Sequence, residues 1–201
     1  STAGLSINST TGAIDVSAST PGTYTVTYLT AGTCPNSSTE SVTINALDDA
    51  SFSYAAAAYC VDATDPTPTA TLVGGSYSST AGLSINSTTG VIDVSASTPG
   101  TYTVTYTTAG TCPNSSTESV TINALDDATF SYAAAAYCVD ATDPTPTATL
   151  GGGSYTSTAG LSINSTTGVI DVSASTPGTY TVTYTTAGTC PNSSTESVTI
   201  N

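Results

Sequence analysis

A long internal repeat limits what this chain can fold into more than any other feature of its sequence. The segment STAGLSINSTTG starts at residue 1 and returns at residues 79 and 157, which gives a period of 78 residues in a chain of 201. Residues 1–45 match residues 157–201 at nearly every position. A period of this length is too long for one solenoid unit and fits a small independent domain. We therefore expect beads on a string.

Linkers separate the repeats where the strand-like pattern breaks. TESVTIN ends at residue 123 as a closing strand, and ALDDA then interrupts the alternation before TFSY begins a new strand. We expect complete repeats at residues 50–123 and 128–201, with acidic linkers at 46–49 and 124–127. Residues 1–45 correspond to the C-terminal part of an earlier repeat. Its core would be open to water unless preceding residues or a neighbouring chain complete it.

The strand signals within one period are dense. GTYTVTYTT (100–108) alternates strictly, so that Tyr102 and Val104 face one way and the threonines between them face the other. LSINSTTGVIDV (83–94) has the form of a hairpin, and the prolines of PTPTATL (66–72) suit an edge strand. About seven such strands fall in each period. The sequence therefore predicts an all-β fold of tandem immunoglobulin-like β-sandwich domains.

The charge and composition exclude several functions. The formal net charge is −14, and the chain has no Lys, Arg or His. Nucleic-acid binding and attraction to anionic lipid both depend on Lys and Arg, and general-base or nucleophilic catalysis by His or Lys is impossible here. No apolar run is long enough to span a bilayer. We expect no nucleic-acid partner, no membrane insertion and no enzyme activity.

One motif carries a resemblance to a known class of protein. In L-S-I-N-x-x-T-G-x-I followed by P-G-T-Y-T-V-T, the chain resembles the immunoglobulin-like and cadherin-like repeats of giant bacterial surface adhesins, including gliding-motility-type proteins. The resemblance covers the whole period. It implies an extracellular location, at a bacterial cell surface or in a secreted filament, where such repeats serve as stalk modules.

The five cysteines are Cys34, Cys60, Cys112, Cys138 and Cys190. We expect disulfides within each repeat, Cys60–Cys112 and Cys138–Cys190, because sandwiches commonly link their own sheets. Such a bond closes a loop of about 50 residues and contributes roughly 4 kcal/mol in the chain-entropy picture. The alternative pairs cysteines across the linkers, Cys34–Cys60 and Cys112–Cys138. Either pattern implies an oxidising compartment.

Acidic residues gather around the linkers, and cadherin-like arrays use acids at such places to bind calcium. Ca²⁺ takes six to eight oxygen ligands, from carboxylates, Asn and backbone carbonyls. We hypothesise Ca²⁺ at each joint, with Asn45 as a further ligand at the first one. The candidate carboxylates are Glu40, Asp48, Asp49, Asp62 and Asp65 and, one period later, Glu118, Asp126, Asp127, Asp140 and Asp143. The alternative is that these are solvated acids in turns.

These observations predict a structural extracellular protein that forms a long, stiff filament or adhesin stalk with calcium-braced joints. Its partners would be neighbouring repeats of the same chain, with self-association or bundling of chains. One alternative is a repeated carbohydrate- or surface-binding module, for which Tyr54, Tyr59 and Tyr77 are candidates if they lie outside the core. Another is a pilus-like polymer, in which residues 1–45 are completed by a donated strand.

Overall fold

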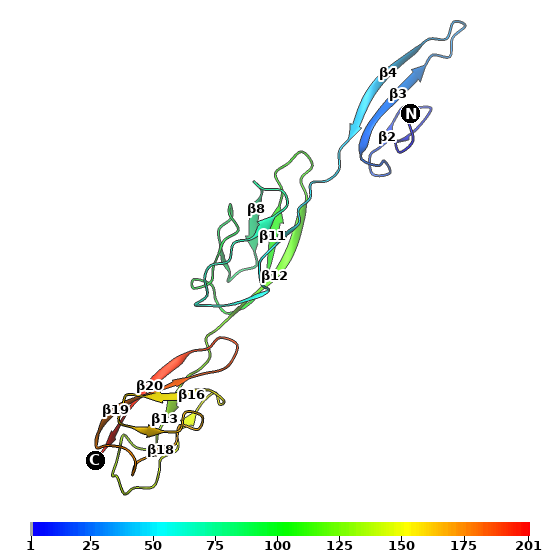
Figure 1. The fold of residues 1–201 in the computed structure, drawn as a ribbon. Coiled ribbons are helices and arrows are strands. Elements are labelled where there is room, and N and C mark those ends of the chain that lie inside the picture. Colours follow the sequence, from blue (N-terminus) through cyan, green and yellow to red (C-terminus); the bar gives the residue numbers. More distant parts are fainter. Residues whose placement is uncertain (1) are drawn as a thin grey trace.

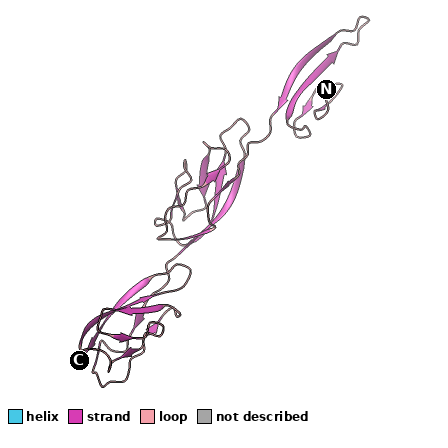
Figure 2. Ribbon diagram, in the orientation of Figure 1, coloured by secondary structure: helices cyan, strands magenta, loops and turns pink. Residues whose placement is uncertain are grey.

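The computed structural model describes residues 2–201, and every regular element in it is a β-strand (Figure 2). The repeats follow one another end to end, and each new one begins after a short linker (Figure 1). Within residues 2–201 there is no helix long and apolar enough to cross a membrane.

The same strands recur in each period. The first repeat, residues 2–45, contains β1 (Ser6–Ile7), β2 (Ile14–Asp15), β3 (Gly22–Leu29) and β4 (Ser37–Ile44). The second repeat, residues 50–123, contains β5 (Phe52–Ser53), β6 (Ala58–Cys60), β7 (Thr69–Ala70), β8 (Ser76–Ser79), β9 (Ser84–Ile85), β10 (Ile92–Asp93), β11 (Gly100–Thr107) and β12 (Ser115–Asn123). The third repeat, residues 128–201, contains β13 (Phe130–Ser131), β14 (Ala136–Tyr137), β15 (Thr147–Ala148), β16 (Ser154–Ser157), β17 (Ser162–Ile163), β18 (Ile170–Asp171), β19 (Gly178–Thr185) and β20 (Ser193–Ile200).

The second and third repeats are two-layered sandwiches with the same topology. In the second repeat the main sheet has the order β6-β12-β11-β8, and the third repeat repeats it as β14-β20-β19-β16. β11 and β12 form a long antiparallel hairpin, whereas β6 runs parallel to β12. The short pairs β5–β7 and β9–β10 complete the domain around the core. The predicted all-β sandwich class is therefore confirmed.

The alternation of β11 explains how this core forms. Tyr102, Val104 and Tyr106 are only 7%, 0% and 1% exposed, while the threonines between them face outward or stay partly exposed. Phe52 and Ile92 reach the same core from the other layer. Full burial of one such apolar side chain stabilises the fold by about 1.5–3 kcal/mol, so the strand's period of two fixes which face turns inward.

The predicted hairpin of residues 83–94 is present as β9–β10. Its turn closes because the Asn86 side chain accepts hydrogen bonds from the backbone of Thr88 and Thr89, both at 2.9 Å. Gly90 then adopts a φ of +72°, which favours glycine. A Cβ at this position would lie 2.6 Å from Pro68 and 2.8 Å from Tyr77, so a side chain is excluded sterically as well.

The first repeat contains only the C-terminal half of this sandwich, and its core faces solvent. Its buried cluster consists of Leu5, Tyr24 and Ile44, at one end of the β3–β4 hairpin. At the other end Tyr28 is 68% exposed, whereas the equivalent Tyr106 is 1% exposed. The open core expected from the sequence is therefore observed.

Candidate functional site

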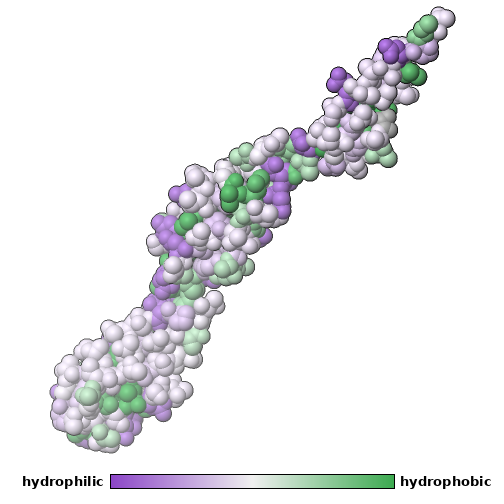
Figure 3. Space-filling view, turned by 45° about the horizontal axis from the view of Figure 1, so that its top comes forward, coloured by the Kyte–Doolittle hydropathy of each residue, from purple (hydrophilic) through white to green (hydrophobic). Residues whose placement is uncertain are grey.

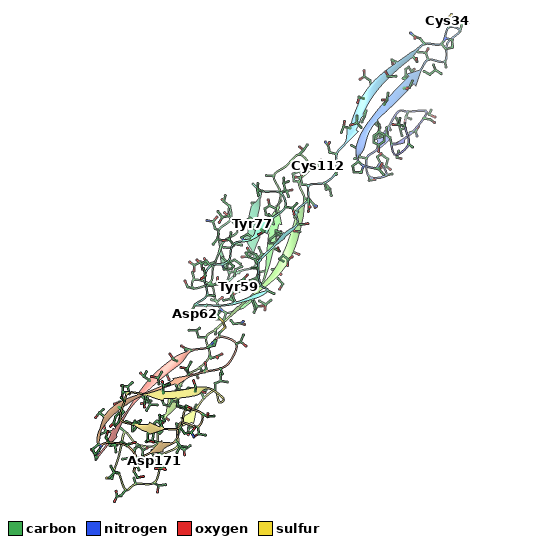
Figure 4. The ribbon with its side chains drawn as sticks, viewed as in Figure 1. Cys34, Tyr59, Asp62, Tyr77, Cys112 and Asp171 are labelled. Atoms are coloured by element: carbon green, nitrogen blue, oxygen red, sulfur yellow. A yellow bond between two sulfur atoms is a disulfide. The ribbon has the colours of Figure 1, made fainter. Side chains whose placement is uncertain are left out.

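The joints between repeats are the places where the acids and cysteines of the sequence meet. At each joint the linker runs along the loop of the next repeat's long hairpin. We call residues 108–114 and 186–192 the hairpin loops of the second and third repeats. Figure 4 shows Cys112 beside the first joint, and Tyr59 and Asp62 at the end of the second repeat that faces the second joint.

Asp126 holds the second linker to the third repeat through both its backbone and its side chain. Its carboxylate Oδ2 accepts hydrogen bonds from Thr186 Oγ1 at 2.8 Å and from the Gly188 backbone N–H at 2.9 Å. Its N–H donates to the Cys190 carbonyl at 2.8 Å, and its carbonyl accepts from Asn192 Nδ2 at 3.1 Å. These four bonds fix one linker residue to one loop.

Asp48 repeats this arrangement at the first joint. Thr108 Oγ1 donates to Asp48 Oδ2 at 2.9 Å, Asn114 Nδ2 donates to the Asp48 carbonyl at 3.1 Å, and the Asp48 N–H donates to the Cys112 carbonyl at 2.9 Å. The carboxylate lies so close to Gly110 that a Cβ there would stand 2.5 Å from Oδ2. Glycine in the TAGTC sequence therefore makes room for the linker.

The second aspartate of each pair has a different role, since it closes the turn into the next repeat. The Asp127 carboxylate accepts a hydrogen bond from the Thr129 N–H at 3.0 Å, and the Asp49 carboxylate accepts from the Ser51 N–H at 3.0 Å and from its Oγ at 2.5 Å. Bonds from the side chains and backbone of Ser51 and Thr129 hold the pKa of Asp49 and of Asp127 below its ordinary value. Both acids are therefore ionised turn formers.

A disulfide crosses the second joint. Cys60 of the second repeat is bonded to Cys190 in the hairpin loop of the third, with the Cα atoms 5.6 Å apart. Among the described residues, Cys34, Cys112 and Cys138 are free thiols. The predicted pairs Cys60–Cys112 and Cys138–Cys190 are therefore wrong, and so are the alternative pairs Cys34–Cys60 and Cys112–Cys138.

The register of β6 on β12 explains the error. Cys60 lies opposite Asn123, at the end of β12, whereas Cys112 lies in the loop before β12 begins. The nine residues of β12 put these two cysteines at opposite ends of the sandwich, roughly 26 Å apart along the strand. Because the linker is short, the next repeat's hairpin loop is the nearest one to Cys60.

The other predicted metal ligands lie at separate places. Asp65 and Asp143 accept hydrogen bonds from the backbone N–H groups of Val94 and Val172, each at 3.1 Å, inside their own repeats. Asp62 and Asp140 are exposed, each two residues after a cysteine, Cys60 or Cys138. Glu40 and Glu118 are exposed in the middle of β4 and β12.

The carboxylates nearest the joints are engaged with the protein chain itself. Across residues 2–201, no three carboxylate or cysteine side chains come together in a way that could hold a metal ion. The two carboxylates closest to the hairpin loops, Asp48 and Asp126, already accept hydrogen bonds from threonine. A Ca²⁺ site needs six to eight oxygen ligands, whereas the contacts present at Asp48 and Asp126 are those of linker docking.

The tyrosines proposed for surface binding serve mainly as core residues. Tyr77 is buried and its ring centroid lies 4.6 Å from that of Tyr106. Tyr54 and Tyr59 pack against the same cluster, and their hydroxyls bond to the Gly90 carbonyl at 2.6 Å and the Ala56 N–H at 2.8 Å. Burial raises the pKa of the Tyr54 hydroxyl, with a smaller contribution from Tyr77. They do not form the exposed aromatic patch that a carbohydrate site requires.

Sequence reasoning missed the residues that receive the linker. They are Thr186, Gly188 and Asn192 and, one period earlier, Thr108, Gly110 and Asn114. The TTAGTCPN segment did mark a turn, but the partner carboxylate lies about sixty residues earlier in the chain. No short-range spacing connects the two.

Comparisons with known proteins leave the family open. No family model and no curated protein matches the sequence. Among solved structures, a protocadherin gammaB7 EC3-6 cis-dimer structure is 17% identical over the whole chain, with a TM-score of 0.37. Mouse cadherin-23 EC22-24 is 15% identical over 89% of the chain and 73% of its own length, with a TM-score of 0.33.

A third similar structure contains protocadherin gamma B2 extracellular cadherin domains 3–6, with 16% identity over the whole chain and a TM-score of 0.38. The 201 residues span 66% of the gammaB7 chain and 65% of the gamma B2 chain. At such low TM-scores the likeness carries no argument about fold, function or partners.

Proposed function

We propose that this chain is a non-catalytic, extracellular structural protein whose repeats build a stiff fibre or stalk. The observation that carries the proposal is the Cys60–Cys190 disulfide between successive repeats. A second connection across a joint that already has a peptide linker restricts how one sandwich turns relative to the next. A disulfide of this kind persists in an oxidising compartment, which supports a location outside the cell.

The docked linker supports the same function. Bonds to charged groups contribute about 1.5–3 kcal/mol when both partners are properly placed, and the Asp126 carboxylate accepts two. The linker is therefore held to the third repeat instead of moving as a free tether, and the hinge is left between residue 123 and Asp126. The disulfide spans this short hinge.

The surface also suits a stalk more than a ligand-binding site. On the face shown in Figure 3, apolar and polar residues form small separate areas on a background of intermediate hydropathy. The net charge of −14, with no basic residue to offset it, keeps separate chains apart at low ionic strength. Bundling of such chains would require counter-ions.

Single-molecule energy transfer tests the stiffness of the joint. The chain contains no lysine, so Thr103→Lys with Thr181→Lys gives two amine sites on equivalent exposed strand positions of the second and third repeats, once the α-amine is blocked. We expect a narrow distance distribution that widens when Cys60→Ser and Cys190→Ser are added. An equally wide distribution before and after removal of the disulfide would refute the proposal.

The first joint supplies the matched control. Thr25→Lys with Thr103→Lys reports on a joint that has the docked Asp48 but, within residues 2–201, no disulfide. Its distribution should be the wider of the two, and the Cys60→Ser and Cys190→Ser changes should leave it unaltered. If the first joint gave a distribution as narrow as that of the second, linker docking alone would set the angle between successive repeats.

Calcium at the joints stays a prediction, and the fibre proposal does not depend on it. Melting of the oxidised chain in Ca²⁺, in Mg²⁺ and in excess EGTA separates a specific site from charge screening. A rise in Tm seen with Ca²⁺ alone and reversed by EGTA would establish a metal at the joints. Equal melting curves under all three conditions would contradict a calcium site at the joints.

A further inference from the structure

The same half-sandwich sequence occurs three times in this chain, but it is covered in only two of the three places. We call residues 50–79 and 128–157 front halves, and residues 2–45, 80–123 and 158–201 back halves. In the first back half Val16 is 63% exposed and Tyr28 is 68% exposed, whereas Val94 and Tyr106 at the equivalent positions are each 1% exposed. The difference lies in what covers them.

The second repeat shows what covers this face. Phe52 and Tyr77 of the front half pack on Tyr106, with ring centroids 5.8 and 4.6 Å away. Pro68 and Tyr77 lie against Gly90, whereas a Cβ at the equivalent Gly12 would meet nothing within 4 Å. The first back half therefore has the contact surface for a front half without the front half itself.

Both edges of the first hairpin are open in the same way. In the second repeat β8 pairs with β11 in an antiparallel register, and β6 pairs with β12 in a parallel one. Within residues 2–45 the equivalent strands β3 and β4 pair only with each other. Unpaired edges of this length present rows of backbone donors and acceptors that bind an added strand.

A hollow of about 310 Å³ marks the position of the absent side chains. It lies between the β1–β2 turn and β3, and its lining includes Ile7, Gly12, Val26 and Tyr28. The aromatic side chains of Phe52 and Tyr77 occupy the corresponding region of the second repeat. Walls that combine apolar side chains with the polar β1–β2 turn, and open backbone edges on both sides, suit a polypeptide that carries aromatic residues at the same spacing.

The free thiol of Cys112 gives a second, independent indication of the same occupant. The front half of the second repeat delivers Cys60 to Cys190, and Cys190 is then 1% exposed. Cys112 is the equivalent of Cys190 one period earlier, and it is a half-buried free thiol. A front half seated on residues 2–45 would bring its cysteine to Cys112 by the same geometry.

We propose that the open face of residues 2–45 binds a further front half with the sequence of residues 50–79, and that its cysteine forms a disulfide with Cys112. The occupant is a further front half because residues 50–79 and 128–157 are already packed in the cores of the second and third repeats. A second copy could donate a front half only by opening one of its own cores. The inference does not depend on the fibre role.

The first test uses a synthetic peptide, ASFSYAAAAYSVDATDPTPTATLVGGSYSS, which is residues 50–79 with Cys60→Ser, added to the whole chain. We expect saturable binding with one peptide per chain and protection of Tyr28 from nitration. A peptide with Phe52→Ala and Tyr77→Ala should bind at least about tenfold more weakly. Equal binding of the two peptides, or none, would overturn the proposal.

Two chain variants locate the binding surface. Tyr28→Ser should weaken binding at least about tenfold and leave the second and third repeats folded, because Tyr28 is already exposed. Leu29→Thr is the matched control, since Leu29 is exposed and positions 107 and 185 are threonine. If Leu29→Thr weakened binding as much as Tyr28→Ser, the peptide would not be seated as in the second repeat.

The second test uses the peptide with its cysteine and a disulfide oxidant, oxidised glutathione. The peptide thiol and one chain thiol each lose a proton and an electron as the new S–S bond forms, and the oxidant leaves as two reduced glutathione molecules. We expect the peptide at Cys112 at least about tenfold more often than at Cys34 or Cys138. An even distribution, or dimers of the chain that exclude the peptide, would overturn the assigned occupant.

Discussion

Cys60 and Cys190 belong to successive repeats, and a disulfide joins them with their Cα atoms 5.6 Å apart. Each full repeat carries one cysteine at the end of β6 or directly after β14, and one in the hairpin loop. The bond therefore uses the trailing end of one repeat and the leading end of the next. An array of such repeats would contain one bond per joint and no bond within a repeat.

Removing the Asp126 carboxylate should detach the second linker. We expect Asp126→Ala to destabilise the third repeat by about 2 kcal/mol, because Thr186 Oγ1 and the Gly188 N–H lose a charged acceptor. Amide exchange of Gly188 should accelerate at the same time. Asp127→Ala is the matched control and should have the smaller effect, since Asp127 is exposed at the turn.

An added methyl group at Gly188 should have a similar effect for steric reasons. A Cβ there would lie 2.5 Å from Asp126 Oδ2, so Gly188→Ala should lower the Tm of the third repeat and speed proteolysis of the linker. Gly32→Ala tests the same sequence position in the first repeat, where nothing lies within 4 Å of the added atom. Equal losses at both positions would show that the loop, and not linker docking, requires glycine.

Identical valines in filled and open cores should differ in their contribution to stability. Val104 is 0% exposed, and Val104→Ala should cost about 2 kcal/mol through lost burial and the cavity left behind. Val26 is the same residue of β3 and only partly buried, so Val26→Ala should cost less than half as much. Chemical denaturation of the two variants checks this, and equal losses would contradict the open core of the first repeat.

Stability should be flat near neutral pH and fall at both extremes. Hydrogen bonds lower the pKa of Asp49, Asp93 and Asp127 in the folded chain, so their contribution is present above the unfolded value near 3.8 and is lost as pH falls below it. Burial raises the pKa of Tyr54 and Tyr132, so their contribution is lost as pH rises above about 10.

The chain has no histidine, so no side-chain type with an ordinary pKa between about 5 and 9 is present except the free cysteines. Tm measured from pH 2 to pH 11 should therefore show a plateau from about pH 5 to pH 8, with thiols blocked. Asp93→Asn should reduce the acid-side loss. A Tm that changed steeply between pH 6 and pH 7 would contradict this assignment of the titrating groups.

Much of the fold could be predicted from local sequence. The alternation of GTYTVTYTT gives β11 and its buried face, and LSINSTTGVIDV gives β9–β10, because both depend on spacing within a few residues. The order of the sheet could not be predicted in this way. The parallel pairing of β6 with β12 joins residues about sixty positions apart, and no turn specifies its register.

The errors at the joints follow from that missing pairing. Without the match of Cys60 to Asn123, nothing in the sequence places Cys60 at the end of the sandwich away from Cys112. The acids at the linkers suggested a metal because the chain offers no cationic side chain. In the structure, Asp126 instead accepts hydrogen bonds from neutral donors: Thr186 and Gly188 donate to its carboxylate, and Asn192 donates to its backbone carbonyl.

Non-reducing digestion with a glutamate-specific protease tests the central claim most directly. After free thiols are blocked and the chain is denatured, cleavage at Glu40, Glu118 and Glu196 separates residues 1–40, 41–118 and 119–196. The Cys60–Cys190 bond predicts that 41–118 and 119–196 stay linked, while 1–40 is released. Three separate fragments would show disulfides within repeats. Three linked fragments would show disulfides between adjacent cysteines across the linkers. Either result would contradict the Cys60–Cys190 joint.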